Sequence, residues 1–242
     1  MNEKGKLYIV ATPIGNLGDI TLRALETLKK VDFILCEDTR NTQKLLNYFE
    51  IKTKTISYHQ HSEIKKLLEI KKLLVSGKNL ALVTDACTPG ISDPGNKLID
   101  MILDEVQVEN SKYFVNKKDS SMIVQSDNII PIPGPSAVIT ALSISGFPAD
   151  KFLFLGFPPH KKGRQAFFKE IAESKYTIVF YESSHRIKKC LLELVKVLNE
   201  KQQLCIGREL TKKFETIYRG TIQEILKMNI SEKGEFVVAV SK

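Results

Sequence analysis

Short apolar runs alternate with amphipathic segments along the first 145 residues, and this alternation limits the fold more than any other feature of the chain. Each run has the length of a strand, and most of the segments between them carry apolar residues at helical spacing. A repeated strand-helix order predicts a parallel sheet with helices packed against it. The expected strands are 6–11, 32–36, 53–57, 80–83 and 129–132, and the expected helices are 21–30, 39–49, 62–76, 95–103 and 137–145.

A second unit is expected to begin near Lys151, after a linker at 146–150. Its predicted strands are 152–157, 176–181, 203–208, 214–220 and 235–240, and its predicted helices are 165–173 and 184–199. A connection of five residues joins the strands 203–208 and 214–220, which predicts an antiparallel hairpin and therefore a mixed sheet. We thus expect an α/β protein of two domains, 1–146 with a mostly parallel sheet and 150–242 with a mixed sheet.

Composition narrows the class of protein. The chain has 242 residues, of which 43% are hydrophobic, enough for a full core, and no apolar run reaches the length of a membrane span. Its four cysteines are scattered, which argues against a disulfide framework or a structural zinc site and favours a reducing cytoplasm. The net charge of +8 suits a polyanionic partner, although a generally lysine-rich surface would give the same value. The polar segment 104–128 is interpreted as an insertion.

The apolar run 80–83 leads into a long and chemically crowded loop. Two aspartates, Asp85 and Asp93, and two Pro-Gly pairs lie before the next expected helix. Because Asp85 directly follows a strand, it is expected at the carboxyl edge of the sheet, where open α/β sheets place their ligands. We interpret this loop as a ligand-binding loop, although an elaborate structural turn would have a similar composition.

The loop after the first strand contains two glycines at 15–18, and Glu37 and Asp38 follow the second strand. This spacing is similar to that of a dinucleotide-binding turn with its ribose carboxylate. The first glycine of that fingerprint is missing, however, and Pro13 lies close to its place, so an ordinary turn is favoured. The histidines of the 59–61 segment supply only two imidazoles, so no metal site is expected.

Polar residues also gather in the second half of the chain. Glu182 follows a strand, Arg186 lies in the next helical turn, and Ser183 or Ser184 could cap that helix. A local capping and ion-pair network explains this segment as well as a functional site does. The charged hairpin segment 207–212 is by itself a weak signal.

The basic loop before the helix 165–173 contains Lys161, Lys162 and Arg164, with Gly163 among them. Mobile cationic side chains of this kind can contact the phosphates of a nucleic acid. An ordinary solvated loop is the alternative interpretation.

Together these segments resemble a known family in content and in order, the bacterial 16S ribosomal RNA cytidine 2′-O-methyltransferases of the tetrapyrrole-methylase superfamily. The resemblance covers nearly the whole chain except the insertion. It is carried by the segments 12–19 (TPIGNLGD), 36–40 (CEDTR), 58–61 (YHQH), 85–95 (DACTPGISDPG), 131–137 (PIPGPSA), 180–186 (FYESSHR) and 207–212 (GRELTK).

The resemblance implies two α/β domains with S-adenosyl-L-methionine in the cleft between them. It also implies a homodimer that acts on 16S ribosomal RNA in the small subunit, without a metal or a membrane. The implied cofactor-binding residues are Ile14, Asp85, Thr88, Ile91, Ser136, Ala137 and Arg208. The candidate catalytic residues are Glu182, Arg186, Glu37 and His59, with Asp38 as a further carboxylate. The candidate RNA-binding residues are Arg40, Lys161, Lys162 and Arg164.

Two other hypotheses stay open, a small-molecule methylase acting on a precorrin or porphyrin and a non-catalytic RNA-binding assembly factor. The sequence also departs from the family in three places. Cys87 lies where glycine is usual, so the loop has to accommodate a side chain. The insertion is longer than the usual connection. Many relatives carry a small helical C-terminal domain without a counterpart in this sequence, which is expected to affect RNA affinity and not the chemistry.

Overall fold

The computed structural model describes residues 5–59, 62, 64–92, 95–103 and 128–242. The chain folds into two compact units, one of residues 1–13 and 17–135 and the other of residues 14–16 and 136–242. The predicted insertion lies outside the described residues, except for Asn128. The first unit ends at residue 135, eleven residues before the end that the sequence analysis expected at residue 146.

The first unit contains a five-stranded sheet whose neighbouring strands pair in parallel, as the strand-helix alternation predicted. The strand order is β3-β2-β4-β1-β5. The strands are β1 (Leu7–Val10), β2 (Phe33–Cys36), β3 (Lys54–Ser57), β4 (Leu80–Leu82) and β5 (Ile129–Ile132). All three residues of β4 are buried, which fits a central strand that is covered on both faces.

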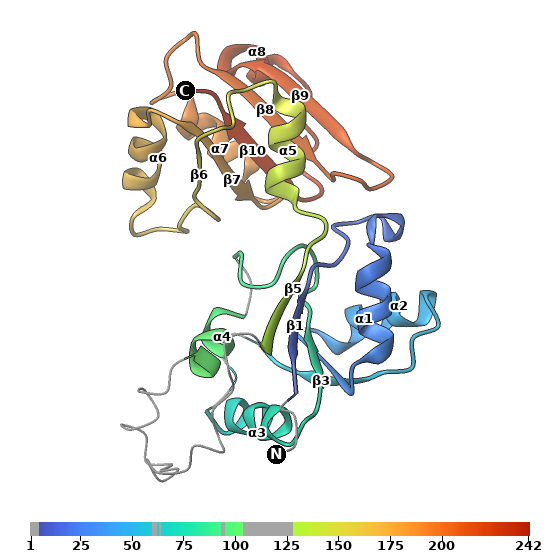
Figure 1. Ribbon diagram of the computed structural model, residues 1–242. Coiled ribbons are helices and arrows are strands. Elements are labelled where there is room, and N and C mark those ends of the chain that lie inside the picture. Colours follow the sequence, from blue (N-terminus) through green and yellow to red (C-terminus); the bar gives the residue numbers. More distant parts are fainter. Residues whose placement is uncertain (1–4, 60–61, 63, 93–94, 104–127) are drawn as a thin grey trace. The chain divides into compact units, whose positions relative to one another are not determined.

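Helices cover both faces of this sheet (Figure 1). The helices are α1 (Leu22–Lys30), α2 (Thr39–Tyr48), α3 (Ile64–Val75) and α4 (Asn96–Leu103), and a short 3₁₀ helix, η1 (Leu17–Asp19), precedes α1. One apolar cluster joins α1 and α2 to the sheet, and a separate cluster joins α3 and α4 to its opposite face. The strands β1 and β2 therefore lead into helices on one face, whereas β3 and β4 lead into helices on the other.

Polar side chains cap the starts of α1 and α2. Thr21 caps α1 by accepting a hydrogen bond from the backbone N–H of Ala24 at 3.1 Å. The N-cap of α2 is Asp38, and Thr39 is the first helical residue. The Asp38 carboxylate accepts the hydrogen bond of the Arg40 backbone N–H at 2.8 Å. An acidic N-cap also complements the partial positive charge at the start of a helix.

The second unit contains a five-stranded mixed sheet, again as predicted. The strand order is β6-β7-β10-β8-β9. The strands are β6 (Phe152–Phe154), β7 (Thr177–Glu182), β8 (Gln203–Arg208), β9 (Thr216–Thr221) and β10 (Phe236–Val240). The antiparallel hairpin of β8 and β9 is confirmed. Every residue of the central strand β10 is buried, so both faces of the sheet are covered.

Four helices pack on this sheet, α5 (Ala137–Ser145), α6 (Arg164–Glu173), α7 (Ile187–Leu194) and α8 (Ile222–Lys227). Phe167, Leu191 and Ile225 of the last three helices share one apolar cluster with the sheet. Helix α5 lies against β10, β8 and β7, on the face opposite to α6 (Figure 1). Because of this packing, α5 belongs to the second unit, and the boundary between the units lies at 135/136. The sequence analysis had placed α5 in the first domain because it directly follows β5 in the chain.

Two local features of this unit differ from the sequence analysis. Helix α7 begins at Ile187, and its N-cap residue is Arg186, not Ser183 or Ser184. Helix α8 was not predicted, although Thr221 and Glu224 form a reciprocal capping box at its start. Among the described residues, no helix is long and apolar enough to cross a membrane. The four cysteines are free and buried.

Candidate functional site

The carboxyl ends of β1 and β4 form the natural ligand position of the first unit. These strands are neighbours in the sheet, yet they lead into helices on opposite faces. Open α/β sheets bind their ligands outside the carboxyl ends of the strands at a switch point of this kind. The loop that follows Asp85 starts at this point, as the sequence analysis expected.

The loops after β1 and β4 are joined by backbone hydrogen bonds. The Thr12 N–H donates to the Cys87 carbonyl at 3.0 Å, and the Cys87 N–H donates to the Thr12 carbonyl at 3.1 Å. The Thr12 hydroxyl also donates to the Thr84 carbonyl at 3.1 Å. The loop after β5 comes equally close, because a Cβ atom added at Gly134 would lie 3.0 Å from the Cβ of Ala11. Three loops are therefore held together at one edge of the sheet.

The loop after β4 contains several residues in the left-handed backbone region. Cys87 has a φ of 75°, Gly90 of 84° and Ser92 of 64°. A residue with a side chain is strained there, typically by about 1–3 kcal/mol, whereas glycine is not. Cys87 is buried. The loop thus accommodates a buried side chain where glycine is usual, at a cost in backbone strain.

Polar side chains from neighbouring elements meet at this edge. Asp85 is exposed, and its carboxylate accepts a hydrogen bond from the Asn41 side chain of α2 at 2.9 Å. Glu37, at the end of β2, is half-buried, and its pKa is raised by burial and by the negative charges of Asp85 and Asp38. His59, just after β3, is exposed and acts on Glu37 in the opposite direction.

Asp38 behaves differently from Glu37, although the two are adjacent. Its carboxylate receives the Arg40 guanidinium, with Nη2 at 2.7 Å and Nε at 3.0 Å, in addition to the backbone N–H that it caps. These interactions lower the pKa of Asp38 to about 2. A carboxylate this acidic is a poor proton acceptor at neutral pH. The Arg40 side chain remains 87% exposed and presents positive charge to the solvent.

The structure thus places six of the predicted site residues in the loops and the helix turn at this edge of the first unit. Glu37, His59 and Asp85 interact electrostatically, Arg40 lies on the adjacent helix turn, and Ile91 is exposed in the same loop as the half-buried Thr88. Asn41 was missed by sequence reasoning. The signal was its position in the opening turn of α2, directly after the CEDTR segment.

The remaining predicted cofactor residues belong to the second unit. Ser136 is the N-cap of α5 and accepts a hydrogen bond from the Ile139 N–H at 3.5 Å, and Ala137 is the first residue of that helix. Ile14 is buried and groups with the same unit. The Arg208 guanidinium donates to the backbone carbonyls of Lys233 at 2.6 Å and Phe214 at 2.8 Å. These bonds fix Arg208 against its own unit.

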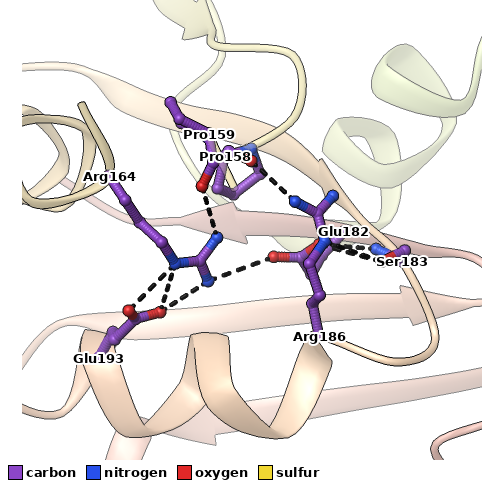
Figure 2. Close-up of polar contacts among 7 residues, drawn as sticks. All are labelled: Pro158, Pro159, Arg164, Glu182, Ser183, Arg186 and Glu193. Carbon is purple, nitrogen blue, oxygen red and sulfur yellow. Dashed lines mark hydrogen bonds and ion pairs between the residues drawn. The ribbon is translucent and has the colours of Figure 1, made fainter. Parts of the chain in front are cut away.

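A buried ionic cluster lies at the end of β7 (Figure 2). Glu182 is 1% exposed, and its Oε1 is 2.9 Å from the Arg186 Nε and accepts the Ser183 N–H at 2.8 Å. Its Oε2 lies 3.6 Å from the Arg164 guanidinium and accepts no hydrogen bond among the described residues. Arg164 in turn pairs with Glu193 of α7, at 2.6 Å between Nη2 and Oε2.

This cluster corrects the expected position of Arg164. The residue is 5% exposed and is the first residue of α6, not a mobile side chain of a solvated loop. Its hydrogen bonds to Glu193 raise its pKa, which keeps the guanidinium charged. Lys161 and Lys162 are exposed, as expected for residues that contact a phosphate. Arg164 does not share that position.

Comparison with known proteins identifies the fold and the family. Residues 6–110 and 123–226 match the family model described as Tetrapyrrole (Corrin/Porphyrin) Methylases. The chain belongs to the tetrapyrrole methylase family. The resemblance that the seven sequence motifs suggested is confirmed, and the α/β architecture with one parallel and one mixed sheet is the architecture of a tetrapyrrole methylase.

Similar curated members of the tetrapyrrole methylase family carry the name ribosomal RNA small subunit methyltransferase I. The Halalkalibacterium halodurans protein is 42% identical over 99% of this chain and 76% of its own length. The Vibrio cholerae protein is 45% identical over 97% of this chain and 76% of its own length. The chain therefore spans about three quarters of each of these methyltransferases.

Solved structures of the family agree in fold. A uroporphyrin-III-C-methyltransferase from Thermus thermophilus matches with a TM-score of 0.63 and 15% identity over 99% of this chain and 95% of its own. A cobalt precorrin-4 methyltransferase matches with a TM-score of 0.61 and 19% identity over 97% of this chain and 94% of its own. At these identities the likeness concerns the fold alone.

Proposed function

We propose that this chain methylates the 2′-hydroxyl of a cytidine in 16S ribosomal RNA, with S-adenosyl-L-methionine as the methyl donor. The observation that carries the proposal is the identity of 42–45% over nearly the whole chain to relatives named ribosomal RNA small subunit methyltransferase I. The two solved methyltransferases compared above, named for uroporphyrin-III and cobalt precorrin-4, are only 15% and 19% identical, which gives no support for a tetrapyrrole substrate. We propose that the substrate is the assembled small subunit. We also propose that the protein is a cytoplasmic homodimer.

The residues at the edge of the first sheet fit S-adenosyl-L-methionine chemically. The exposed carboxylate of Asp85, oriented by Asn41, suits the ammonium group of the cofactor's amino acid part. Ile91 is 46% exposed and offers apolar surface to an aromatic base. We assign Asp85, Thr88 and Ile91 to cofactor binding, and Ile14, Ser136, Ala137 and Arg208 by the family resemblance. Bound there, the cofactor supplies a methyl group activated by its sulfonium.

The 2′-hydroxyl is a weak nucleophile until its proton is removed, so a general base is expected. Glu37 fits this role best among the candidate residues. It is half-buried at a strand end, and its raised pKa makes it a better proton acceptor than an ordinary carboxylate. Asp38 is held ionised by Arg40 and is disfavoured. His59, exposed beside Glu37, is the second candidate, either as a base or as the group that orients the carboxylate.

Glu182 and Arg186 were also candidate catalytic residues, but their geometry suits another role. Glu182 is 1% exposed and has two guanidinium groups beside its carboxylate. A base has to come within hydrogen-bond reach of the proton that it accepts, about 2.6–3.2 Å or one water away. A carboxylate enclosed in this way does not offer that access. We therefore propose that Glu182 and Arg186 support the site without touching the reacting atoms.

Methyl transfer from labelled S-adenosyl-L-methionine to small subunits that lack the modification tests the proposal. We expect incorporation of one methyl group per subunit at a cytidine ribose, located by mapping the 2′-O-methyl position. Labelling of a tetrapyrrole but not of RNA would identify a small-molecule methylase. Absence of cofactor binding in calorimetry would favour the non-catalytic assembly factor instead.

A variant pair tests the cofactor site independently of the substrate. Asp85→Ala is expected to weaken the cofactor affinity by roughly tenfold or more, because a hydrogen bond to a charged group is worth about 1.5–3 kcal/mol. Its free energy of unfolding should stay within about 0.5 kcal/mol of the parent, since the side chain is exposed. Asp100→Ala, at an exposed acid of α4, is the matched control. Equal affinities for both variants would contradict the assignment of Asp85.

A further inference from the structure

The loop between β6 and α6 presents a group of basic side chains in the second unit. We call residues 158–163 the basic loop; it reads Pro-Pro-His-Lys-Lys-Gly. His160, Lys161 and Lys162 are all exposed, and the loop contains no acidic residue. Two positive charges without a carboxylate within the same loop are suited to a polyanion such as RNA. A loop of this composition would be expected to move freely unless something held it.

The buried ionic cluster holds the start of this loop. Arg186 donates from Nη1 to the Pro158 carbonyl at 3.0 Å, and Arg164 donates from Nη1 to the Pro159 carbonyl at 3.1 Å (Figure 2). Both prolines have a fixed φ and lack an N–H, so the chain around these carbonyls is already stiff. Two consecutive carbonyls are thus bound by two different guanidinium groups.

Both guanidinium groups are themselves fixed by carboxylates. Glu193 binds Arg164 through three short contacts, two to Nε at 3.0 and 2.9 Å and one to Nη2 at 2.6 Å. Glu182 lies between the two arginines, near Arg186 on one side and Arg164 on the other. The cluster therefore links the basic loop to β7, α6 and α7, which are rigid elements of the unit.

The far end of the loop is also fixed. Gly163 is the N-cap of α6 with a φ of 87°, a left-handed conformation that glycine adopts without strain. The Arg164 N–H donates back to the Lys161 carbonyl at 3.3 Å, and the Phe167 N–H donates to the Gly163 carbonyl at 3.0 Å. Lys161 and Lys162 therefore project from a segment that is anchored on both sides.

Stability alone does not account for such a cluster. Replacing a buried ion pair by well-packed apolar residues is often neutral or stabilising, because burying the charges is costly. Buried charged groups are better explained where they impose a specific geometry, and here two of the hydrogen bonds from the cluster end on the loop. Loops fixed in their bound conformation lose less entropy when they bind, so anchoring increases affinity without an added contact.

We propose that Arg164 and Arg186 are positioning residues that hold the basic loop so that Lys161 and Lys162 contact the phosphates of the ribosomal RNA substrate. The inference rests on the proposed function and gives it a second site, in the second unit. Arg164 acts through the lysines and not by touching RNA, because it is 5% exposed and fully engaged by Glu193 and Pro159.

A double-mutant cycle distinguishes this role from direct contact and from a purely structural one. The variants are Lys161→Ala/Lys162→Ala, Arg164→Gln and the combination of all three. The KM for unmodified small subunits and kcat are measured for each, with cofactor affinity by calorimetry. The lysine variant should raise KM roughly tenfold with kcat unchanged, because charge contacts that bind substrate and transition state equally are lost.

Arg164→Gln should also raise KM without changing kcat or the cofactor affinity. In the lysine-free background the same substitution should have no further effect on KM, because residues that act as one unit are not additive. Additive effects would show that Arg164 acts independently of the lysines and would overturn the proposal. A Gln variant with a lower melting temperature but an unchanged KM would overturn it as well.

Two further variants keep the test decisive. If Arg164→Gln does not fold, Arg164→Lys replaces it, since an ammonium can pair with Glu193 but lacks the planar fork that also reaches Pro159. Lys169→Ala, at an exposed residue of α6 that pairs with Glu173, controls for loss of positive charge on the same helix and should leave KM unchanged. A parent that does not methylate small subunits would refute the proposed function and this inference together. A parent that methylates them with additive KM effects would refute this inference alone.

Discussion

The two units each assemble acidic and basic side chains at a strand end, but they expose them differently. In the first unit Asp85 and Arg40 are open to solvent and Glu37 is half-buried beside them. In the second unit Glu182 and Arg164 are at most 5% exposed and are paired with each other and with neighbours. The same residue types therefore serve different purposes. An exposed group can meet a ligand, whereas an enclosed one can only fix the elements around it.

This contrast could not be read from the residues themselves. The segments that contain Glu37 and Glu182 both follow apolar strands and both contain an arginine within four residues. The distinction depends on Arg164 and Glu193, which lie 29 positions apart and meet only because α6 and α7 pack on the same face of the sheet. A long-range pair of this kind leaves no periodic signal in a single sequence.

The largest expected effect concerns Glu37, in the first unit. Glu37→Gln should lower kcat by about 10²–10⁴-fold, the usual contribution of a general base, while cofactor affinity and stability stay close to those of the parent. The parent's kcat should rise with pH through the pKa of Glu37, which burial places above the ordinary range of a glutamate. The kcat-pH profile measured on small subunits checks both points.

The Glu37→Gln variant should lose this rising limb, and Glu26→Gln, at an exposed residue of α1, should keep it. The contribution of Glu37 to stability changes with pH in the opposite direction to its contribution to kcat. A carboxyl whose pKa is raised in the folded state binds its proton more tightly there than in the unfolded chain. Its favourable contribution is present below the unfolded pKa and is lost as the pH rises through the folded pKa. An unchanged profile in Glu37→Gln would make His59 the leading candidate.

The second prediction concerns the buried ionic cluster of the second unit, where we expect an effect on stability and not on chemistry. Glu182→Gln should lower the free energy of unfolding by about 3–5 kcal/mol, the typical result of removing one partner from a buried ionic group. Urea unfolding at neutral pH measures this value. Glu173→Gln, at a 66% exposed partner of Lys169, is the matched control and should change it by less than about 0.5 kcal/mol.

The folded fraction of the Glu182→Gln variant should retain its kcat. A variant that is as stable as the parent but has lost turnover would instead identify Glu182 as the base and break the contrast between the two groups.

Most of the fold was predictable because it depends on local patterns. The strands of both sheets and the β8–β9 hairpin follow from apolar runs and connection lengths. The short helix α8 was missed because its six residues are too few to show a helical period, although its capping box was present in the sequence. The assignment of α5 to a unit could not be predicted, because its apolar residues do not indicate which sheet they pack against.

The candidate site was predictable where it depends on strand ends and not where it depends on burial. Asp85 and Glu37 lie at the sheet edge as expected, because residues that follow parallel strands meet there. Arg164 was placed in a solvated loop because its neighbours Lys161, Lys162 and Gly163 are typical of one. Its burial arises from Glu193 and from its cation–π contact with Phe168, at 5.1 Å from the ring centroid.

The smallest expected effect concerns the strain in the loop that carries Asp85. Cys87→Gly should be about 1 kcal/mol more stable than Cys87→Ala, since both lack the sulfur but only alanine retains a Cβ at a φ of 75°. Ala86→Gly is the control at the preceding residue, which does not have a positive φ, and it should destabilise the protein as glycine usually does. If Cys87→Gly were instead less stable than Cys87→Ala, the positive φ at this position would not determine the stability of the loop. Its backbone bonds to Thr12 would then be the feature that holds Asp85 at the sheet edge.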